Sequence, residues 1–513
     1  MKPPKEDEYF ASDQLRSNLK ARAIRGAGAT VFSQASQYAI QMIGTVILAR
    51  LLTPDAFGLV AMVAAFSFLF QNFGLRGLTE ATIQSDVIDH KKISTLFWIH
   101  VGLSFIVTLF FIALSPFLVW LYKEPRLETI TIVMALSFVF TALSTQHLAL
   151  LARSMRFYRI TAIEIIAAIV TQGVAIFMAA EGWDYWSLVA RRVAPFVATA
   201  ACAWILCRWV PGLPVRGSGI IPMLKFGMHT YGNFAANYFS RNLDKILVGW
   251  RFGAQSLGHY ERAYYLFAMP VNQLTHPLTN VAVAALSRLR KESEKYSDSY
   301  LKSLSMLAFI GMPLSSVLTL TGRDLLLLLL GPQWTIAGQI FTVFGPSIGI
   351  TLVYGTHGWL HLSLGKPDRW FRWGIIELAV TAACFVIGLP FGALGVAIAY
   401  TGSYYLLIGP GLWYAARPAR IRLSSILSTI WGYYVSALIA GTICWYLLYS
   451  FDVTSSIFKD LNIFVRILVS SVLCISFYIL LSSAFFGKKK ALSEFISLLR
   501  QMVPKDEQER FHN

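Results

Sequence analysis

The stretch "LVGWRFGAQSLGHY" (residues 247–260) has a counterpart 200 residues earlier, "ILARLLTPDAFGLV" (47–60). In this alignment Gly58 falls on Gly258, and Asn72 falls on Asn272. Both stretches follow an apolar segment and lead into another one. The chain is therefore expected to contain two copies of one structural unit, each with a helical hairpin at this place.

The composition predicts an all-α polytopic membrane protein. Of the 513 residues, 56% are hydrophobic and 14% are charged, whereas a soluble domain carries about 25% charged residues. The first 27 residues are hydrophilic and basic, so no cleaved signal peptide is expected. The five cysteines lie in apolar stretches without a CxxC pair and are expected to be buried hydrophobic residues.

Apolar segments long enough to cross a bilayer, which takes about 20 residues, divide the chain into about 14 transmembrane helices. The predicted spans are 28–50, 57–79, 93–121, 127–151, 160–180, 185–209, 222–251, 256–283, 299–322, 336–362, 369–391, 393–416, 425–450 and 462–486. Three short connections carry turn or helix-start residues, namely Thr53-Pro54-Asp55, Gly331-Pro332-Gln333 and Gly388-Leu389-Pro390.

Basic residues are distributed unevenly between the predicted loops. The two tails and every second loop hold 32 of the 44 Lys and Arg residues, and the alternate loops hold seven. Such a bias predicts that both termini and the basic loops are cytoplasmic. It also explains the net charge of +17 as a topology signal, so no nucleic-acid partner is expected.

The repeat groups the spans as six, six and two. The expected domains are a cytoplasmic N-terminal segment, an N-lobe of spans 1–6, a C-lobe of spans 7–12, the last two spans and a cytoplasmic tail, at residues 1–27, 28–210, 222–416, 425–486 and 487–513. Parallel repeats of this kind place a substrate path between the two lobes. Residues 14–24 and 488–503 have the pattern of interfacial helices on an anionic leaflet or, alternatively, of solvated tails.

Polar side chains recur in equivalent positions of spans 1 and 7. Ser33, Gln37 and Gln41 lie at i, i+4 and i+8, hence on one helix face. The 200-residue shift places them on Asn233, Asn237 and Arg241, and it places Gly44 on Asp244 and Thr45 on Lys245. A polar face inside a helical bundle lines a water-filled cavity or makes interhelical hydrogen bonds, and the sequence leaves both interpretations open.

Charges at membrane depth are costly and are usually functional. Five basic residues of the spans (Arg191, Arg192, Arg241, Lys245 and Arg262) outnumber Asp244 and Glu261 in the outer half, while Glu164 and Glu377 lie nearer the cytoplasmic ends. We expect an ion pair between Arg241 and Asp244, which are three residues apart. An excess of cations suits phosphate groups, whereas Asn and Gln suit sugar hydroxyls.

The predicted substrate-binding residues are accordingly Arg241, Lys245, Asp244, Arg191, Arg192, Arg262, Gln37, Gln41, Asn233 and Asn237. Other interpretations stay open, namely a packing salt bridge for the Arg241–Asp244 pair and snorkelling to the membrane surface for Arg191 and Arg192. Asp244 and Glu261 are also candidates for coupling transport to protons or sodium. His357 and His361 are better explained by helix packing than by a metal site. No catalytic residue, metal or cofactor is expected.

Several motifs resemble the polysaccharide-transporter, or Wzx-type oligosaccharide-lipid flippase, family of the multidrug/oligosaccharidyl-lipid/polysaccharide (MOP) exporter superfamily. They are "ILARLLTPDAFGLVAM" (47–62), "GWDYWSLVA" (182–190), "RNLDKILVGWRFGAQSLGHYERAYYL" (241–266), "GPQWTIAG" (331–338) and "GALGVAIA" (392–399). Their order and spacing cover about residues 20–485. The sequence departs from the family pattern at His259, after the hairpin glycine, and at the Arg191-Arg192 pair of span 6.

The resemblance implies two pseudo-symmetric six-helix lobes with two extra C-terminal helices. It also implies export of a polyprenyl-diphosphate-linked oligosaccharide across the bacterial inner membrane by alternating access, for exopolysaccharide, capsule or O-antigen assembly. The expected partners are this glycan, membrane lipids and, further, a polysaccharide polymerase and glycosyltransferases. Two alternatives stay open, an ion-coupled multidrug exporter of the same superfamily and a polytopic polysaccharide polymerase. The chain has no Walker A sequence, so no ATP hydrolysis is expected.

Overall fold

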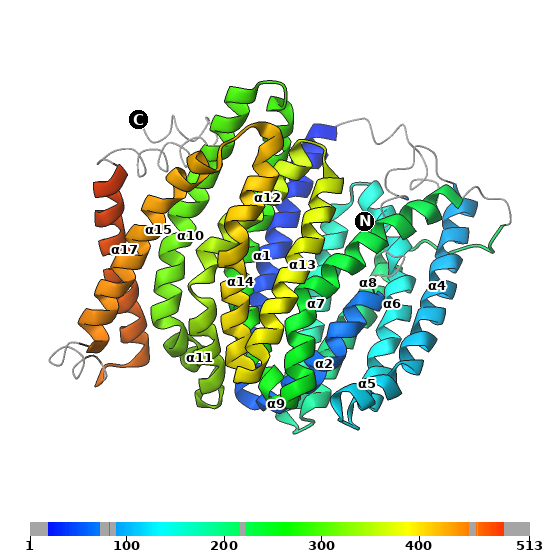
Figure 1. Cartoon of the computed structure of the whole chain (residues 1–513). Coiled ribbons are helices and arrows are strands. Elements are labelled where there is room, and N and C mark those ends of the chain that lie inside the picture. The colour runs from blue at the N-terminus through cyan, green and yellow to red at the C-terminus, as the bar shows by residue number, and fades with distance from the viewer. Residues whose placement is uncertain are drawn as a thin grey trace, which may run out of the picture. The chain divides into compact units, whose positions relative to one another are not determined.

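The computed structural model shows a helical protein, and the residues that it describes contain no β-strand (Figure 1). The backbone is described for residues 19–71, 82, 89–215, 221–450, 458 and 460–486. Within these ranges, the side chains of residues 19–27, 29, 31, 221–241, 276, 280, 485 and 486 are not described. The predicted interfacial helix 488–503 and residues 14–18 of the other one, 14–24, therefore lie outside the description.

The chain divides into two compact units, Met1–Glu261 and Arg262–Asn513. The helices of the first unit are α1 (Leu19–Leu51), α2 (Pro54–Gln71), α4 (His90–Ala113), α5 (Ser115–Tyr122), α6 (Leu127–Arg153), α7 (Phe157–Ala180), α8 (Tyr185–Cys207) and the first part of α9 (Ile221–Leu289). In this unit α7 packs against α1 and α8, and α6 packs against α4 and α8.

The second unit begins within α9. Its other helices are α10 (Ser293–Leu330), η3 (Pro332–Trp334), α11 (Thr335–Phe344), α12 (Ser347–Ser363), α13 (Pro367–Gly388), η4 (Leu389–Phe391), α14 (Gly392–Ala416), η5 (Arg417–Ala419), α15 (Leu423–Trp445), the π-helical turn η6 (Tyr446–Ser450) and α17 (Ile463–Phe486). Here α10 packs against α11, α12, α15 and α17, and α14 packs against α12 and α13. The domain boundaries expected from the repeat stay predictions.

Each predicted span overlaps a described helix or a pair of consecutive helices, and residues 72–79 of the predicted span 57–79 lie outside the described residues. Among the described residues, nine helical segments are long and apolar enough to cross a membrane, or ten when the pair α11–α12, bent by 53°, counts as one span. One of the nine segments, Pro367–Ala419, contains both α13 and α14. The chain is thus a multi-pass membrane protein, and the number of 14 stays a prediction.

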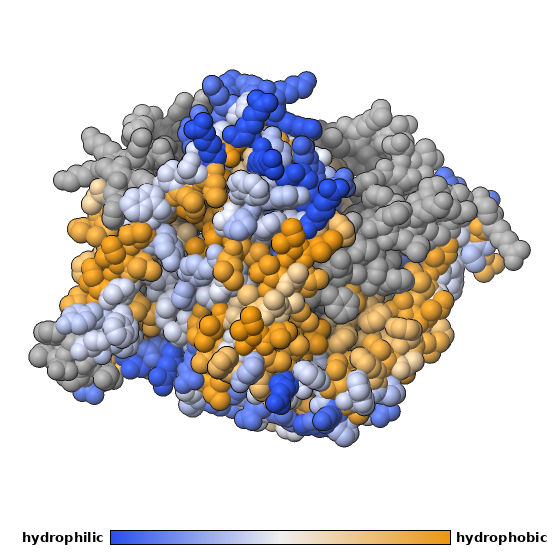
Figure 2. Space-filling view, viewed as in Figure 1, coloured by the Kyte–Doolittle hydropathy of each residue, from blue (hydrophilic) through white to orange (hydrophobic). Residues whose placement is uncertain are grey.

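Burial separates α2 from the other candidate spans. Within its most apolar window 72% of the residues are buried, against 17–50% in the other eight segments. The helices α5 and α13, in contrast, expose large apolar side chains, such as Trp120 at 72% and Ile387 at 71%. Figure 2 shows hydrophobic residues over much of the visible surface, with hydrophilic residues gathered near helix ends. We conclude that α2 is an inner helix, whereas α5 and α13 present side chains suited to lipid.

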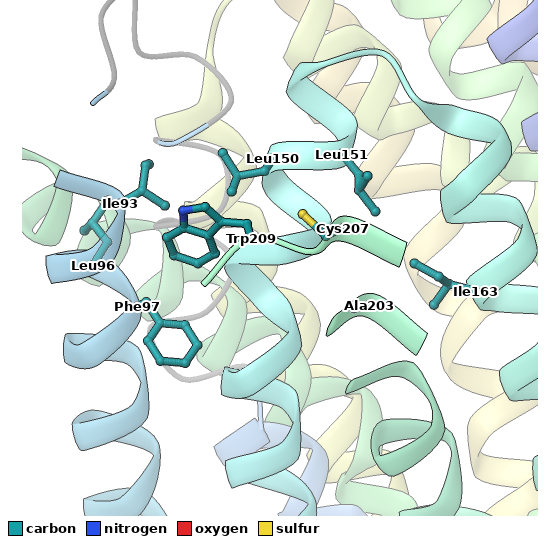
Figure 3. Packing of buried hydrophobic residues seen from close by; sticks show 9 residues of the cluster. All are labelled: Ile93, Leu96, Phe97, Leu150, Leu151, Ile163, Ala203, Cys207 and Trp209. Carbon is teal, nitrogen blue, oxygen red and sulfur yellow. The ribbon is translucent and has the colours of Figure 1, made fainter. Parts of the chain in front are cut away.

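The chain segment after α8 is fixed to the first unit. Trp209 is fully buried in a cluster with residues of α4, α6, α7 and α8, including Phe97 and Cys207 (Figure 3). Further along, the Trp98 indole donates to the Gly212 carbonyl at 2.9 Å, and the Gly212 N–H donates to Ser94 Oγ at 2.9 Å. Side chains of α4 thereby satisfy backbone groups of a segment that has no helix of its own.

Local sequence explains where α2 begins and where α9 is interrupted. Thr53 caps α2, since its Oγ1 accepts a hydrogen bond from the Ala56 N–H at 3.4 Å, and Pro54 occupies the first helical position. Gly253 interrupts α9 with φ 79° and ψ −176°, a conformation that glycine adopts readily. This break lies between the predicted spans 222–251 and 256–283, so it forms the hairpin expected there.

Candidate substrate-binding site

The two glycines that the repeat aligns lie at one helix crossing. A Cβ atom added to Gly58 of α2 would lie 1.7 Å from the Ala254 carbonyl oxygen, and one added to Gly258 would lie 1.8 Å from the Pro54 carbonyl oxygen. The 200-residue shift exchanges these two contacts. Each repeat therefore contributes the same surface to this crossing, as the two subunits do in a two-fold symmetric, or isologous, interface. The crossing therefore requires glycine at both positions and supports the alignment residue by residue.

Asp244 of α9 pairs with a side chain from beyond the Gly253 break. Its side chain is 1% exposed, and its Oδ2 accepts a hydrogen bond from the Tyr260 hydroxyl at 2.8 Å. Its other oxygen has no hydrogen-bond partner among the described residues. The expected partner was Arg241, whose side chain lies outside the description, as do those of Asn233 and Asn237. For the described residues, Asp244 therefore joins the two parts of α9.

The sequence contains a signal for this pair that the pattern of charges does not show. Asp244 and Tyr260 stand eight residues before and after Phe252, at the hairpin. Because the two arms of a helical hairpin run antiparallel, residues at equal distance from the turn lie at similar depth. Tyr260 therefore lies opposite Asp244 in the hairpin, and this placement predicts the hydrogen bond from its hydroxyl to the carboxylate.

Two other cations of this region are partly or fully buried. Lys245 is half-buried, and its Nζ lies 3.4 Å from Asn242 Oδ1. Arg262, at the start of the second unit, is 6% exposed, and its guanidinium lies 5.1 Å from the ring centre of Tyr265. A cation at this distance from an aromatic face is attracted by it. His259, the departure from the family pattern, is 3% exposed beside the glycine crossing.

The polar face of α1 contacts a carboxylate of α7. Ser33 Oγ donates to Glu164 Oε2 at 2.6 Å, and Gln37 Nε2 donates to the same oxygen at 3.1 Å. Gln37 also lies 3.0 Å from Ser33 Oγ. Of the two interpretations of this face, interhelical hydrogen bonding therefore holds for Ser33 and Gln37. A substrate-binding role for Gln37 and Gln41 stays a prediction.

The two arginines of α8 have different surroundings. Arg191 is half-buried, and its Nη2 donates to Thr45 Oγ1 of α1 at 2.7 Å and approaches the Gln41 carbonyl at 3.5 Å. Arg192 is exposed. Adjacent residues of one helix point about 100° apart, so only one of the two arginines turns toward α1. Arg191 is thus held inside the first unit, and snorkelling is an interpretation that now suits Arg192 alone.

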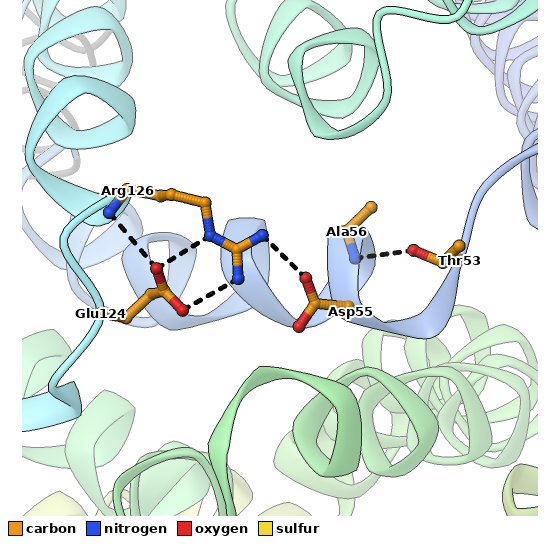
Figure 4. Close-up of polar contacts among 5 residues, drawn as sticks. All are labelled: Thr53, Asp55, Ala56, Glu124 and Arg126. Atoms are coloured by element: carbon orange, nitrogen blue, oxygen red, sulfur yellow. Dashed lines mark hydrogen bonds and ion pairs between the residues drawn. The ribbon is translucent and has the colours of Figure 1, made fainter.

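An ion cluster fixes the start of α2 to the loop before α6 (Figure 4). Arg126 binds both carboxylate oxygens of Glu124, at 2.8 and 2.9 Å, and Asp55 Oδ2 at 3.0 Å. Its guanidinium also lies 5.9 Å from the ring centre of Tyr185, at the start of α8. The hydrogen bond from Arg126 lowers the pKa of the Glu124 carboxyl. The cluster holds α2 at the end that contacts Gly258.

A carboxylate of α13 and two histidines of α12 lie together in the second unit. The Tyr354 hydroxyl donates to Glu377 Oε2 at 3.0 Å and accepts the Trp373 indole N–H at 2.7 Å. His357 Nδ1 lies 2.6 Å from the Tyr354 carbonyl oxygen, and its ring centre lies 6.0 Å from that of His361. Both histidines take part in ring packing. No group of three or more His, Cys, Asp and Glu side chains suited to a metal ion occurs among the described residues.

A separate pocket of about 270 Å³ opens between α10, α14 and α15. Its lining contains hydroxyl-bearing residues such as Ser316, Tyr405 and Tyr434 beside apolar ones, and no charged residue. None of the predicted substrate-binding residues lines it. The charged groups of α8 and α9 and this pocket are therefore separate features.

The model of the polysaccharide biosynthesis protein family matches residues 47–338. The chain belongs to this family. The matched range includes the glycine crossing, Glu164, Arg191 and the Asp244–Tyr260 pair. Ser33, Gln37 and Glu377 lie outside it.

Two relatives within polysaccharide biosynthesis cover most of the chain. The lipopolysaccharide biosynthesis protein WzxC of Escherichia coli K12 is 23% identical over 410 residues, which are 77% of this chain and 82% of WzxC. The teichuronic acid biosynthesis protein TuaB of Bacillus subtilis is 23% identical over 361 residues, which are 69% of this chain and 74% of TuaB.

Solved structures identify the fold of this family member. The lipid II flippase MurJ, in an inward closed conformation, superposes with a TM-score of 0.71 at 14% identity, covering 91% of this chain and 99% of MurJ. A multidrug resistance transporter of the MATE family, from the MOP superfamily, gives a TM-score of 0.51 at 14% identity over 77% of this chain and 96% of its own. The chain thus has the polytopic transporter fold that the resemblance implies.

Proposed function

We propose that this chain is a flippase that moves polyprenyl-diphosphate-linked oligosaccharide units across the bacterial inner membrane by alternating access. The observation that carries the proposal is that a multi-pass member of the polysaccharide biosynthesis family holds cations on its helices away from the helix ends. Keeping a charge at membrane depth costs several kcal/mol, and a diphosphate linkage is the part of such a substrate that cations recognise.

The substrate-binding residues that we propose are those of the sequence analysis, with Lys245 and Arg191 as the central cations. The half-buried side chains of both residues support their role, because a partly dehydrated cation binds phosphate more strongly than a solvated one. Arg241, Asn233 and Asn237 belong to the same proposal through their place in the repeat. Asp244 is proposed to act by holding the α9 hairpin beside these cations.

The distribution of Lys and Arg supports an inner-membrane orientation with both termini in the cytoplasm. In this orientation, the substrate is taken up on the side where cytoplasmic glycosyltransferases complete it, and it is released on the side where a polymerase uses it. The chain itself is proposed to have no catalytic role.

Two alternatives predict different activities. An ion-coupled multidrug exporter binds cationic drugs, for which an excess of cations in the membrane region is unfavourable. A polysaccharide polymerase extends or cleaves glycan. The similarity to WzxC and TuaB, named for polysaccharide biosynthesis, favours the flippase over a drug exporter.

Transport by purified protein tests the proposal. Liposomes containing the chain and an undecaprenyl-diphosphate-linked oligosaccharide with a fluorescent sugar are treated with a membrane-impermeant quencher. We expect the quenched fraction to rise toward completion with the protein, while half of the label stays protected in empty liposomes. Unchanged protection, together with extension or cleavage of the glycan or with transport of a cationic dye, would contradict the flippase.

A further inference from the structure

The pocket of about 270 Å³ in the second unit is a groove along two helices. Its lining extends from Met312 to Leu320 on α10 and from Tyr434 to Trp445 on α15, and α14 adds Tyr405. At a rise of 1.5 Å per residue, the two stretches are about 12 and 16 Å long. Because α10 packs against α15, the pocket is elongated along both helices, as an extended chain molecule requires.

Small residues form the place where the two helices meet in this groove. Ser316 Oγ donates to the Ala437 carbonyl oxygen at 2.6 Å, and a Cβ atom added to Gly441 would lie 3.3 Å from Ser316. The lining also includes Leu438 and Trp445, which are 54% and 53% exposed. Both helices belong to segments that are apolar enough to cross a membrane, so exposed side chains of this kind face lipid. The groove is thus accessible from the lipid phase.

The hydroxyl groups of the lining already have acceptors for their protons. Thr319 and Thr442 donate to carbonyl oxygens of their own helices at 2.6 and 2.9 Å, and Tyr405 donates to that of Pro346 at 3.1 Å. Ser316 donates across to α15, as described above. A hydrocarbon chain in the groove therefore leaves none of these four donors without an acceptor. No charged residue lines the groove, so it suits hydrocarbon and not a headgroup.

The two helices run in the same direction along the groove. Ser305 Oγ lies 3.1 Å from the Tyr433 hydroxyl, and further along both helices Ser316 contacts Ala437. Trp445 therefore lies at the end of the groove toward which both helices run. An indole ring is typical of the membrane–water interface, so we expect a bound chain to enter the groove from this end.

An exposed cation follows the groove at the same end. Thr319 lines the groove, and Arg323 comes one turn later on the same face of α10. Arg323 is exposed, while the neighbouring carboxylate of Asp324 pairs with Arg466 of α17 at 3.0 Å. A guanidinium group binds phosphate through charge-assisted hydrogen bonds. The order along α10 is thus a hydrocarbon groove followed by a phosphate-binding side chain.

We propose that this groove binds one acyl chain of a membrane phospholipid, with Arg323 beside the phosphate of the same lipid. Phospholipid is the hydrocarbon source in greatest excess around a membrane helix, so mass action favours it over a rare prenyl lipid. The site goes beyond the proposed transport function and does not depend on it, because none of the proposed substrate-binding residues lines the groove.

Photolabelling of the purified full chain in detergent tests the proposal. The probe is phosphatidylglycerol with a diazirine in the middle of one acyl chain, and the labelled residues are mapped by peptide mass spectrometry. We expect labelling of residues 312–320 and 434–445 to saturate, whereas labelling of the exposed apolar residues Ile375 and Ile387 of α13 rises in proportion to the probe. Diacylglycerol with the same chain lacks the phosphate and is expected to need a roughly tenfold higher concentration for half-saturation, the effect of about one charge-assisted hydrogen bond.

Two variants separate the chain from the phosphate. G441F places a large side chain in the groove and is expected to abolish the saturable labelling, whereas G409F on α14, at a position with open space, retains it. R323Q is expected to weaken phosphatidylglycerol binding roughly tenfold and to leave diacylglycerol binding unchanged. R422Q removes an exposed cation just before α15, at the opposite end of that helix, and is expected to change neither.

Labelling of residues 312–320 that does not saturate in the wild type, or a preference for phosphatidylglycerol that persists in R323Q, would overturn the proposal. Displacement of the probe by undecaprenyl phosphate at a lower concentration than by unlabelled phosphatidylglycerol would assign the groove to a prenyl chain and overturn it as well. Should G441F fail to fold, the saturation of the wild type and the preference of R323Q decide. Because no glycan is present in this assay, failure of the flippase in liposomes leaves the result unaffected.

Discussion

The helices α1 and the first part of α9 hold equivalent positions in the two repeats, yet they acquire their charges differently. α1 has a neutral polar face, to which α7 contributes Glu164 and α8 contributes Arg191. α9 carries Asp244 and Lys245 itself, and one oxygen of its buried carboxylate accepts a hydrogen bond from Tyr260 of the same helical hairpin. The comparison teaches that in this chain a cation lies at the same position of the two aligned helices, although a neighbouring helix supplies it to α1.

The contact at positions 44 and 244 explains part of this difference. A Cβ atom on Gly44 would lie 2.0 Å from Gln172 Oε1 of α7, so a side chain at position 44 would require the Gln172 side chain to move. The equivalent Asp244 instead turns toward Tyr260. α1 is thus tightly packed against α7, whereas α9 uses the same position for a hydrogen bond within its hairpin.

The largest expected effect is at the glycine crossing, where the two repeats make equivalent contacts. G58V and G258V each force a branched side chain into a backbone carbonyl less than 2 Å away. Overpacking of this kind costs about 3 kcal/mol or more, and we expect almost no folded protein by size-exclusion chromatography in detergent. G102V, at a position with open space, is the control. Normal yield of G58V would show that the two repeats do not depend on this crossing.

The second prediction concerns the α9 side of the comparison. Y260F removes the donor to a fully buried carboxylate, which is expected to lower the free energy of unfolding by roughly 1–3 kcal/mol. D244N retains the shape and is expected to have a smaller effect. In the double variant the two effects should not add, because both remove the same hydrogen bond. Thermal unfolding of the three proteins measures the coupling, and additive losses would argue against this pair.

The third prediction concerns α1, which depends on a neighbouring helix. E164L leaves Ser33 and Gln37 without their acceptor and is expected to destabilise the protein by about 1–2 kcal/mol. E164Q retains a carbonyl oxygen and is expected to lose less than about 1 kcal/mol. E181Q, at the exposed end of α7, serves as the control in the same thermal measurements. Equal losses for E164L and E164Q would mean that negative charge, rather than an acceptor, is needed at this position.

The smallest effect concerns the ion cluster that supports α2. Since Arg126 lowers the pKa of Glu124 from its ordinary value of 4.5, the carboxylate contributes stability above pH 4.5, and this contribution is lost as the pH falls through the lowered pKa. Because Arg126 is 40% exposed, the contribution is at most about 1 kcal/mol. The melting temperature of the wild type should exceed that of E124Q near pH 6, and the difference should shrink as the pH falls below 4.5. A constant difference would exclude Glu124 as the titrating group.

The helical elements were largely predictable from the sequence, because each depends on local composition. Long apolar segments become helices in a membrane, where backbone groups must bond within the segment. Thr53-Pro54 predicts the start of α2, and the hairpin between spans 7 and 8 has Gly253 at its break. The lobe boundaries and the substrate-binding residues stay predictions, since they depend on contacts between helices, which the sequence of a single segment does not give.

The partners of the polar side chains were less predictable. The charge pattern suggested Arg241 as the partner of Asp244, and Tyr260 was missed because a hydroxyl leaves no charge signal in the sequence. Glu164 is expected near the cytoplasmic end of its span, and the sequence did not indicate that it accepts hydrogen bonds from Ser33 and Gln37 of α1. A single sequence gives the depth of a residue along its helix, but not the direction in which the helix is turned.

The sequence by itself determined that the chain is a helical membrane protein and predicted two related halves, because hydropathy and the repeated glycine motif are properties of short segments. Only the tertiary structure decided that Gly58 and Gly258 meet at one crossing, that Asp244 is held by Tyr260 and that Arg191 reaches Thr45. These contacts join residues of different helical segments, and their distances depend on how close the backbones approach. The distance between helix backbones is set by small residues and by packing across the whole bundle. The order of residues along one helix does not specify it.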